Sequence, residues 1–323
     1  MTGAQGVSQH AASALVLICY NSQLEMQKIL LYYKFAPLAD PEAVRLWQHT
    51  LCEQLNLKGR ILISPKGING TVGGDLEDVK AYAKATKQYV PFKGIEFKWS
   101  DGSRDDFPKL SVKVRDETVT FGLPDIDVDE KGVVNGGKRI KPNELDDFMT
   151  KNPDAILFDG RNNYESAIGK FKNAVTPDVN HFRELPNELD KPEYEALKDK
   201  QIITYCTGGI RCETLTALMK QKGFKDVYQL HGGIVKYGEA KKDDGLWQGK
   251  CFVFDKRMNV AFSDRSKDIG TCSQCQVSTS NYANCAYMPC NNLVLICSKC
   301  SSTTETCSAA CAERLVLSSE RIA

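Results

Sequence analysis

The residues of this sequence best suited to chemistry are cysteines, and they occur in two settings. In the first, Cys206 ends an apolar, β-branched run at 202–205 and precedes Gly208, Gly209 and a run with helical spacing at 214–220. This order predicts a buried strand, a tight loop and a helix. Loop N–H groups and the positive end of the helix both favour a thiolate at Cys206, which is the reactive form. The alternative is a small, inert, buried thiol at a strand end.

The loop after this strand resembles the active-site loop of the rhodanese family. Between Cys206 and Arg211 lie Thr207, Gly208, Gly209 and Ile210. In that family the cysteine becomes a persulfide and the arginine closes the loop, so the resemblance implies catalytic roles for Cys206 and Arg211. Related phosphatases carry one more residue between cysteine and arginine, and the shorter loop therefore favours sulfur over phosphate. Cys212 is either a packing residue at the helix start or a resolving thiol.

A second segment resembles the same family. An apolar run at 155–159 predicts a buried strand that ends in Asp159, Gly160 and Arg161, with Glu165 shortly after. In rhodaneses an acid and an arginine at this place brace the loops around the site, so the resemblance implies supporting roles for Asp159, Arg161 and Glu165. The alternative is an ordinary surface ion pair, which contributes little to stability.

A third rhodanese feature follows the last expected strand of this unit, at 227–230. It consists of His231, Gly232 and Gly233. The glycines permit a sharp strand-to-helix turn close to the loop of Cys206. His231 is either a hydrogen-bonded packing residue or a base.

The second cysteine setting is the C-terminal region, where eight of the thirteen cysteines fall between Cys272 and Cys311. Short-spaced thiolate pairs suit tetrahedral zinc, because each pair supplies two ligands from one tight turn. Four pairs predict two closed four-cysteine sites, which are structural rather than catalytic. The alternatives are a reduced or partly disulfide-linked tail and an iron–sulfur cluster.

The pairing of these cysteines stays open at the level of sequence. An interleaved arrangement forms one site from Cys272, Cys275, Cys297 and Cys300, and the other from Cys285, Cys290, Cys307 and Cys311. A sequential arrangement joins the first four cysteines and the last four. Such a module can also present a surface to RNA.

Bulk composition predicts a soluble globular protein of two or three domains. The 323 residues are 42% hydrophobic and 26% charged, and the net charge is +1. Total charge therefore gives no argument for nucleic-acid binding, and any basic surface must be local. No apolar run is long enough for a membrane span, and no secretory signal is visible, so we expect a cytoplasmic protein without membrane partners.

Four segments are expected, in the α/β and α+β classes. Residues 14–100 predict a ferredoxin-like (acylphosphatase-like) domain, because the elements from residue 28 follow the order β-α-β-β-α-β, after an extra strand at 14–20. A connector with β-structure follows at 101–139. A rhodanese domain with a parallel central sheet spans 140–250. The cysteine-rich, zinc-binding tail occupies 251–323 and is expected to begin near a single strand at 249–258.

The connector contains an alternating run at 110–115 that predicts a strand. Lys109, Lys113 and Arg115 then share one face of it. This face is either a solvated strand surface or a stripe that follows the phosphates of RNA.

The whole pattern resembles the rhodanese-domain tRNA uridine hydroxylases, which form 5-hydroxyuridine at wobble position 34 using oxygen. The resemblance covers 28–311. Its most specific parts are Gly67-Ile68-Asn69-Gly70, expected in a turn at 65–70, and the loop ending in Cys212 and Glu213. It implies tRNA as partner, molecular oxygen as co-substrate and catalysis by Cys206 through a persulfide. No flavin motif, nucleotide motif or His/carboxylate iron triad is visible, so no oxygen-activating cofactor is indicated.

Two other functions stay compatible with the sequence. One is a rhodanese sulfurtransferase that passes persulfide sulfur to a thiol or to tRNA. The other is a non-catalytic RNA-binding scaffold with a vestigial loop. The sequence indicates neither the oligomeric state nor the set of tRNAs.

Overall fold

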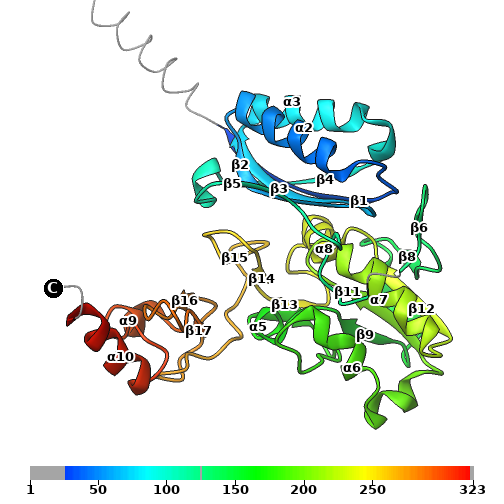
Figure 1. The fold of residues 1–323 in the computed structure, drawn as a ribbon. Coiled ribbons are helices and arrows are strands. Elements are labelled where there is room, and N and C mark those ends of the chain that lie inside the picture. The colour runs from blue at the N-terminus through cyan, green and yellow to red at the C-terminus, as the bar shows by residue number, and fades with distance from the viewer. Residues whose placement is uncertain (1–25, 124–125, 321–323) are drawn as a thin grey trace, which may run out of the picture.

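The N-terminal unit is a twisted sheet with two helices on one face (Figure 1). The structure is a computed structural model that describes residues 26–123 and 126–320. Its elements are β1 (Gln27–Phe35), α2 (Pro41–Gln54), β2 (Lys58–Ser64), β3 (Gly67–Asp75), α3 (Leu76–Gln88), β4 (Glu96–Asp101) and β5 (Leu110–Val114). The strand order β4-β1-β3-β2 confirms the predicted ferredoxin-like arrangement. The extra strand expected at 14–20 lies outside the described residues.

Local signals place these helices as expected. The Asp40 side chain accepts a hydrogen bond from Ala43 N at 2.9 Å, and Pro41 is the first helical residue. Apolar residues of both helices pack on one face of the sheet, where Tyr32 and Tyr82 are fully buried. The opposite face of the sheet is therefore left for other partners.

Two expectations about this unit are corrected. The segment from Gly67 to Gly70 lies in strand β3, not in a turn, because β2 and β3 pair from Ser64 and Gly67 onward. The strand expected in the connector, β5, pairs in parallel with β2 as a fifth strand of the N-terminal sheet. This pairing satisfies the backbone groups at the edge of β2.

The uncovered face of the sheet carries two rows of side chains that run across all five strands in register. One row consists of Glu96, Tyr33, Asn69, Leu62 and Lys113, and the next of Lys98, Leu31, Thr71, Arg60 and Ser111. Side chains of one row point the same way because strand residues alternate between faces. The rows connect the basic strand β5 at one edge with β4 at the other.

The second unit is an α/β domain built on the parallel sheet β8-β12-β11-β9. Its elements are β8 (Lys138–Ile140), α4 (Leu145–Lys151), β9 (Ile156–Asp159), α5 (Asn163–Ser166), β10 (Gly169–Phe171), α6 (Leu185–Glu188), β11 (Gln201–Tyr205), α7 (Ile210–Gln221), β12 (Asp226–Leu230), α8 (Gly233–Lys241) and β13 (Trp247–Gly249). Apolar clusters cover the two faces of this sheet. The predicted rhodanese-like sheet is confirmed.

The C-terminal module is small and contains short elements. They are β14 (Cys251–Phe252), β15 (Asn259–Val260), β16 (Tyr282–Asn284), β17 (Leu293–Leu295), α9 (Ser298–Ser301) and α10 (Ala309–Glu320). The expectation of a single strand at 249–258 is wrong. The chain reverses there, since Met258 has a positive φ of 56° and Val253 N donates to Met258 O at 3.0 Å.

The buried apolar cluster of this module consists of Cys272, Ile296 and Cys297. So small a core contributes little stability by itself. Within the ranges that the structure describes, no helix has the length and apolar character that crossing a bilayer requires.

Candidate active site and metal centres

The loop after β11 holds the sulfur of Cys206 against backbone N–H groups. Gly209 has a left-handed conformation, with φ +100°, and its N–H donates to Cys206 Sγ at 3.1 Å. A Cβ at Gly209 would lie 2.9 Å from the Tyr33 hydroxyl, so glycine is needed for space as well as for conformation. Helix α7 begins at Ile210, earlier than its apolar spacing indicated. Its positive N-terminus therefore lies beside the sulfur.

Helix α8 holds the carbonyl groups of the same loop. Ile234 N donates to Cys206 O at 2.9 Å and Val235 N donates to Thr207 O at 3.1 Å. Gly233 is the first residue of α8, and a Cβ there would lie 2.4 Å from Cys206 O. The glycine pair after β12 thus allows the close approach expected from sequence. It anchors the loop carbonyls while Gly209 N–H faces the sulfur.

This environment favours the thiolate of Cys206. The thiol is fully buried, and burial alone raises its pKa. Hydrogen bonding from Cys212, the charge of Arg211 and the N–H groups of Cys212 and Gly209 outweigh burial and lower the pKa of Cys206 to about 6. The pKa of Cys212 is raised, by burial first and then by its hydrogen bond and proximity to Cys206. Cys212 is therefore the protonated partner of a Cys206 thiolate.

Arg211 is held by Glu165 rather than by the sulfur. Its two terminal nitrogens donate to the two carboxylate oxygens of Glu165 at 2.5 and 2.8 Å, and one of them also reaches Thr207 Oγ1 at 3.2 Å. Both charged side chains are buried. This two-point geometry fixes the guanidinium plane behind the loop. The arginine closes the loop, as the resemblance implied.

Asp159 and Arg161 form a second buried pair. Arg161 donates to the two carboxylate oxygens of Asp159 at 2.8 and 2.6 Å and to Gly169 O at 2.6 Å. Arg161 is 0% and Asp159 1% exposed, so an ordinary surface ion pair is excluded. Arg161 also donates to the backbone of Glu165 at 3.4 Å. The two pairs thus form one network behind Cys206.

The N-terminal domain contributes side chains to this site that the sequence did not single out. The Tyr33 hydroxyl donates to Glu213 of α7 at 3.0 Å, and Leu31 covers Gly208. Lys98 is 3% exposed and lies 4.9 Å from the centre of the Tyr33 ring. Burial lowers the pKa of Lys98 to about 8, although the charges of Glu96 and Cys206 oppose this shift. No local sequence signal connects these residues with Cys206, because the connection is made by domain packing.

His231 belongs to the same domain interface. Its Nε2 lies 3.1 Å from Glu96 of the N-terminal domain. It is thus a hydrogen-bonded residue of the interface, and within the described residues no hydrogen bond or ion pair joins it to Cys206.

A cavity of about 190 Å³ opens between the sheet face and the cysteine loop. Leu31, Tyr33, Asn69 and Thr71 line it from the sheet, Thr207, Gly208, Ile210 and Arg211 from the loop, and Phe254 from the segment before the C-terminal module. Both domains are required to form it.

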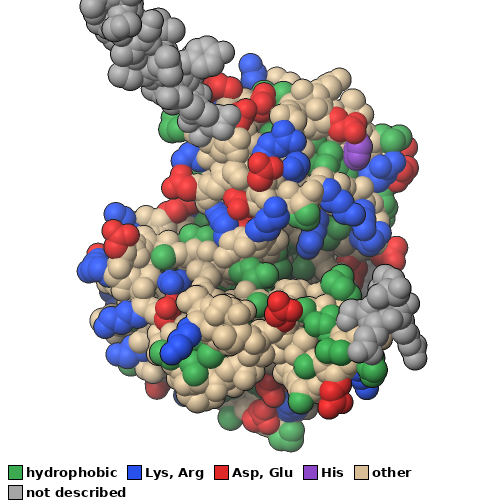
Figure 2. All heavy atoms as spheres, turned by 90° about the vertical axis from the view of Figure 1, so that its left-hand side faces the viewer, with side chains coloured by type: hydrophobic (Ala, Val, Ile, Leu, Met, Phe, Trp, Pro, Cys, Tyr) green, Lys and Arg blue, Asp and Glu red, His purple; other side chains and the backbone are tan. Residues whose placement is uncertain are grey.

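A groove of about 390 Å³ adjoins this cavity. The two share Arg60, Leu62, Phe107 and Phe254. Lys109, Lys113 and Arg115 all line the groove, as the predicted shared face requires. Figure 2 shows Lys and Arg side chains gathered on the N-terminal domain above a hollow bordered by hydrophobic side chains.

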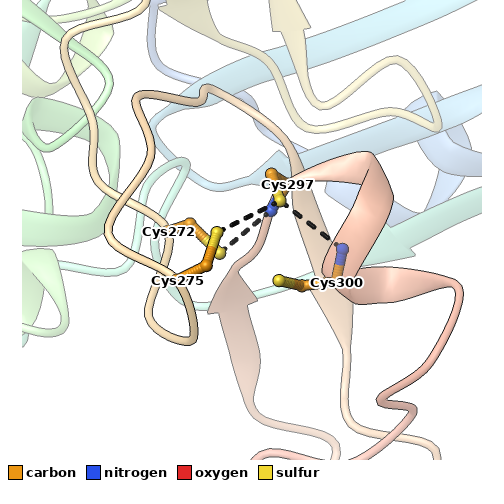
Figure 3. A group of neighbouring side chains, drawn as sticks. All are labelled: Cys272, Cys275, Cys297 and Cys300. Atoms are coloured by element: carbon orange, nitrogen blue, oxygen red, sulfur yellow. Dashed lines mark hydrogen bonds between the residues drawn. The ribbon is translucent and has the colours of Figure 1, made fainter.

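The eight C-terminal cysteines form two groups that can each hold a metal ion. One group is Cys272, Cys275, Cys297 and Cys300 (Figure 3), and the other is Cys285, Cys290, Cys307 and Cys311. The structure therefore selects the interleaved arrangement over the sequential one. Within each group all four sulfur atoms lie within 4.8 Å of one another.

Sulfur spacing in both groups is that of ligands around one ion. Cys275 Sγ lies 3.7 Å from Cys297 Sγ, and Cys307 Sγ lies 3.5 Å from Cys290 Sγ. Four sulfurs placed about 2.3 Å from one tetrahedral ion lie about 3.8 Å apart. Disulfide sulfurs would be about 2.05 Å apart. A disulfide-linked tail is therefore excluded for these pairs.

The lowered pKa of Cys206 predicts thiolate at neutral pH. We expect the ultraviolet thiolate absorbance of the protein, minus that of Cys206→Ser, to rise with a midpoint near pH 6. In Arg211→Gln the midpoint should move up by about one unit or more, since an opposite charge is lost. A wild-type midpoint near the unperturbed value of about 8.5 would contradict the assignment.

Burial of the ion-pair network predicts that similar substitutions inside and outside it lower the free energy of unfolding by different amounts. Glu165→Gln leaves Arg211 without a buried counter-charge and should lower the free energy of unfolding by about 3–5 kcal/mol. The matched control is Glu195→Gln, which removes an exposed pair with Lys198 and should cost less than about 1 kcal/mol. Urea denaturation followed by circular dichroism measures both, and equal losses would refute the burial argument.

Known protein families match the three units separately. The UPF0176 acylphosphatase like domain matches 27–118, the rhodanese-like domain matches 141–240, and the rhodanase C-terminal family matches 248–312.

Curated relatives match along most of the chain. A protein of Arthrobacter sp. (strain FB24) is 53% identical over 296 residues, which cover 90% of this chain and 100% of the relative. One of Rhodococcus jostii (strain RHA1) is 55% identical over 279 residues, or 86% of this chain and 98% of the relative. Both carry the name tRNA uridine(34) hydroxylase. With its acylphosphatase-like sheet packed over the loop of Cys206, the chain belongs to the tRNA uridine(34) hydroxylase family.

Proposed function

We propose that this protein hydroxylates uridine 34 of tRNA and that Cys206 is its reactive residue. The observation that carries the proposal is the position of Cys206: its loop lines a cavity that two domains form together, through Thr207 and Gly208, and its pKa is lowered to about 6. A thiolate at a helix N-terminus is a strong nucleophile. The names of the relatives supply the substrate and the reaction.

Molecular oxygen is the proposed co-substrate, and a persulfide on Cys206 is the proposed working form. Two observations support sulfur chemistry: the short loop between Cys206 and Arg211, and the N–H group of Gly209 directed at the sulfur. Arg211, Asp159, Arg161 and Glu165 have positioning roles, since they hold the loop through buried ion pairs. Cys212 donates to the thiolate, and this supports a role beyond packing.

The groove at β5 is the proposed path of the RNA backbone. Lys109, Lys113 and Arg115 line it, and it shares Arg60, Leu62, Phe107 and Phe254 with the cavity beside the Cys206 loop. Cationic side chains spaced along a groove suit a chain of phosphates. A cytoplasmic location is also proposed, because it would bring the protein together with a tRNA substrate.

Sulfur transfer to a thiol or to tRNA is the second candidate, because the same loop can deliver persulfide sulfur. A non-catalytic scaffold is disfavoured by the low pKa of Cys206, which RNA binding does not require. The two catalytic candidates differ in the atom added to uridine.

Zinc is the proposed ion at both four-cysteine groups. All-sulfur tetrahedral sets suit zinc, and a filled ligand set implies a structural role. Multi-iron clusters require the cysteine sulfurs to reach different iron atoms, whereas each group here converges on one point. The small apolar core of the module agrees with metal-dependent folding.

Nucleoside mass spectrometry tests the activity. tRNA from a deletion strain carrying the wild-type protein should contain 5-hydroxyuridine, and its added oxygen should carry the label when cells grow in ¹⁸O₂. Cys206→Ala should abolish the product because the nucleophile is lost. Cys52→Ala, at a buried cysteine in the N-terminal core, should retain it. If the modified uridine had gained a sulfur atom and no oxygen atom, the activity would be sulfur transfer and not hydroxylation.

Metal analysis tests the C-terminal module. The purified protein should contain two zinc ions per chain, and Cys300→Ser should reduce this number to one, since it removes a ligand from one group only. Chelation should lower the unfolding temperature, because metal binding contributes to folding. Iron in place of zinc, or loss of both ions in Cys300→Ser, would contradict two independent zinc sites.

A further inference from the structure

We propose that the cavity above Cys206 is a nucleobase site in which Asn69 selects uracil and Phe254 stacks on the ring. This inference rests on the proposed function, since it names how that same site recognises its base. It assigns residues of the N-terminal sheet and of the C-terminal segment to substrate recognition. Neither residue belongs to the rhodanese-like loop.

Asn69 lies at the centre of the sheet face, where the cavity is. It lies on β3, opposite Tyr33 of β1 and Leu62 of β2, and all three side chains line the cavity. A base that enters here therefore meets Asn69 on one side and the cysteine loop on the other.

The orientation of the Asn69 amide is set by one hydrogen bond. Its Nδ2 donates to Thr118 O at 3.2 Å, and a carbonyl oxygen can only accept. This bond distinguishes Nδ2 from Oδ1 without reference to any ligand. Among the described residues, no hydrogen bond to Oδ1 is found, so this oxygen of a cavity-lining residue is free to accept one.

An acceptor at this position distinguishes the two pyrimidines. Uracil presents an N3–H donor on its Watson–Crick edge, and proteins read unpaired bases on that edge. Cytosine presents an unprotonated N3 there, which would face the lone pairs of Oδ1. A site whose polar atom is left unpaired rejects the wrong ligand more strongly than an apolar wall does.

Phe254 supplies the stacking surface. It is 51% exposed, although its ring borders both the cavity and the basic groove. Phe252 and Arg211 support the ring, with Phe252 at 5.2 Å between ring centres and the guanidinium of Arg211 at 5.8 Å. An exposed aromatic ring at the end of a cationic groove is the arrangement that proteins use for single-stranded bases.

The distances along the sheet fit one nucleotide and its neighbours. In the row from β5 to β1, Lys113 is followed by Leu62, Asn69 and Tyr33. Adjacent strands lie about 4.8 Å apart, so Lys113 and Asn69 are separated by about 10 Å. A phosphate at Lys113 can therefore belong to the strand whose base reaches Asn69.

Binding measurements with the full-length protein test the site. The probes are anticodon stem-loop RNAs with uridine, 3-methyluridine or cytidine at position 34, and fluorescence anisotropy gives the Kd. Wild-type protein should bind the uridine RNA about tenfold more tightly than the other two, which lack the N3–H donor. In Asn69→Ala this preference should fall below about twofold. Asn143→Ala, at an exposed asparagine outside the sheet, should retain it.

Two further variants separate stacking and charge from base selection. Phe254→Ala should raise the Kd of all three RNAs by about tenfold without changing the order of their affinities, because stacking does not depend on the base edge. Lys113→Ala should weaken the binding of all three RNAs equally. It should also reduce the slope of log Kd against log salt concentration by about one.

The proposal is overturned if wild-type protein binds the three RNAs equally, or if Asn69→Ala keeps the full preference. The comparison of uridine with 3-methyluridine uses wild-type protein, so it tests the proposed base site even if the Asn69→Ala variant fails to fold. Preference for uridine without any hydroxylated product would leave the base site standing and remove the proposed function. Hydroxylated product without any preference in binding would support the proposed function and remove the base site.

Discussion

Burial of a charged sulfur is the constraint on which the rest of the structure depends. A thiolate inside a protein costs several kcal/mol unless dipoles and counter-charges surround it. Here Gly209 N–H, the N-terminus of α7 and the Cys212 thiol supply the dipoles, and Arg211 supplies the charge. Arg211 is itself buried and needs Glu165. The same requirement extends to Arg161 and Asp159, so the charges that compensate one another lie in two segments of the domain, after β9 and after β11.

Packing of the N-terminal domain converts this sulfur into a site. The loop of Cys206 lies at the carboxyl end of a strand of a parallel sheet, where ligands of α/β proteins commonly bind. The open face of the ferredoxin-like sheet covers it, and Tyr33 joins the two domains by its bond to Glu213. Glu213 is also bound by Arg139 and Gln229, so the contact point is rigid. The walls of the cavity and the environment of the sulfur are thus supplied largely by different domains.

The C-terminal module also contacts the site network. The Tyr282 hydroxyl donates to Tyr164 O at 2.7 Å, and Tyr164 directly precedes Glu165. Phe252 packs between Tyr164 and Tyr282, with ring centres 5.2 and 5.7 Å away. The C-terminal module therefore helps to position α5, the helix that carries the counter-charge of Arg211. This gives the module that contains the two cysteine groups a physical connection to the network around Cys206.

Several features of this protein were determined by sequence alone. Strand, glycine loop and helix around Cys206 follow from local conformational preferences, as do the capped helix at Pro41 and the β-α-β-β-α-β order. The spacing of the cysteines predicted two four-cysteine groups, because ligand pairs are local. The loop from Cys206 to Arg211 predicted a rhodanese-like domain, which the parallel sheet and the family match confirm.

Only the tertiary structure decided how these parts meet. It selected the interleaved cysteine pairing, placed Asn69 on a strand face instead of a turn, and brought Tyr33, Lys98 and Phe254 to the loop of Cys206. These outcomes depend on contacts between segments that are distant in sequence, and Tyr33 lies 180 residues from its partner Glu213. Such contacts are set by the shape and charge of whole surfaces, which no local pattern of residues encodes.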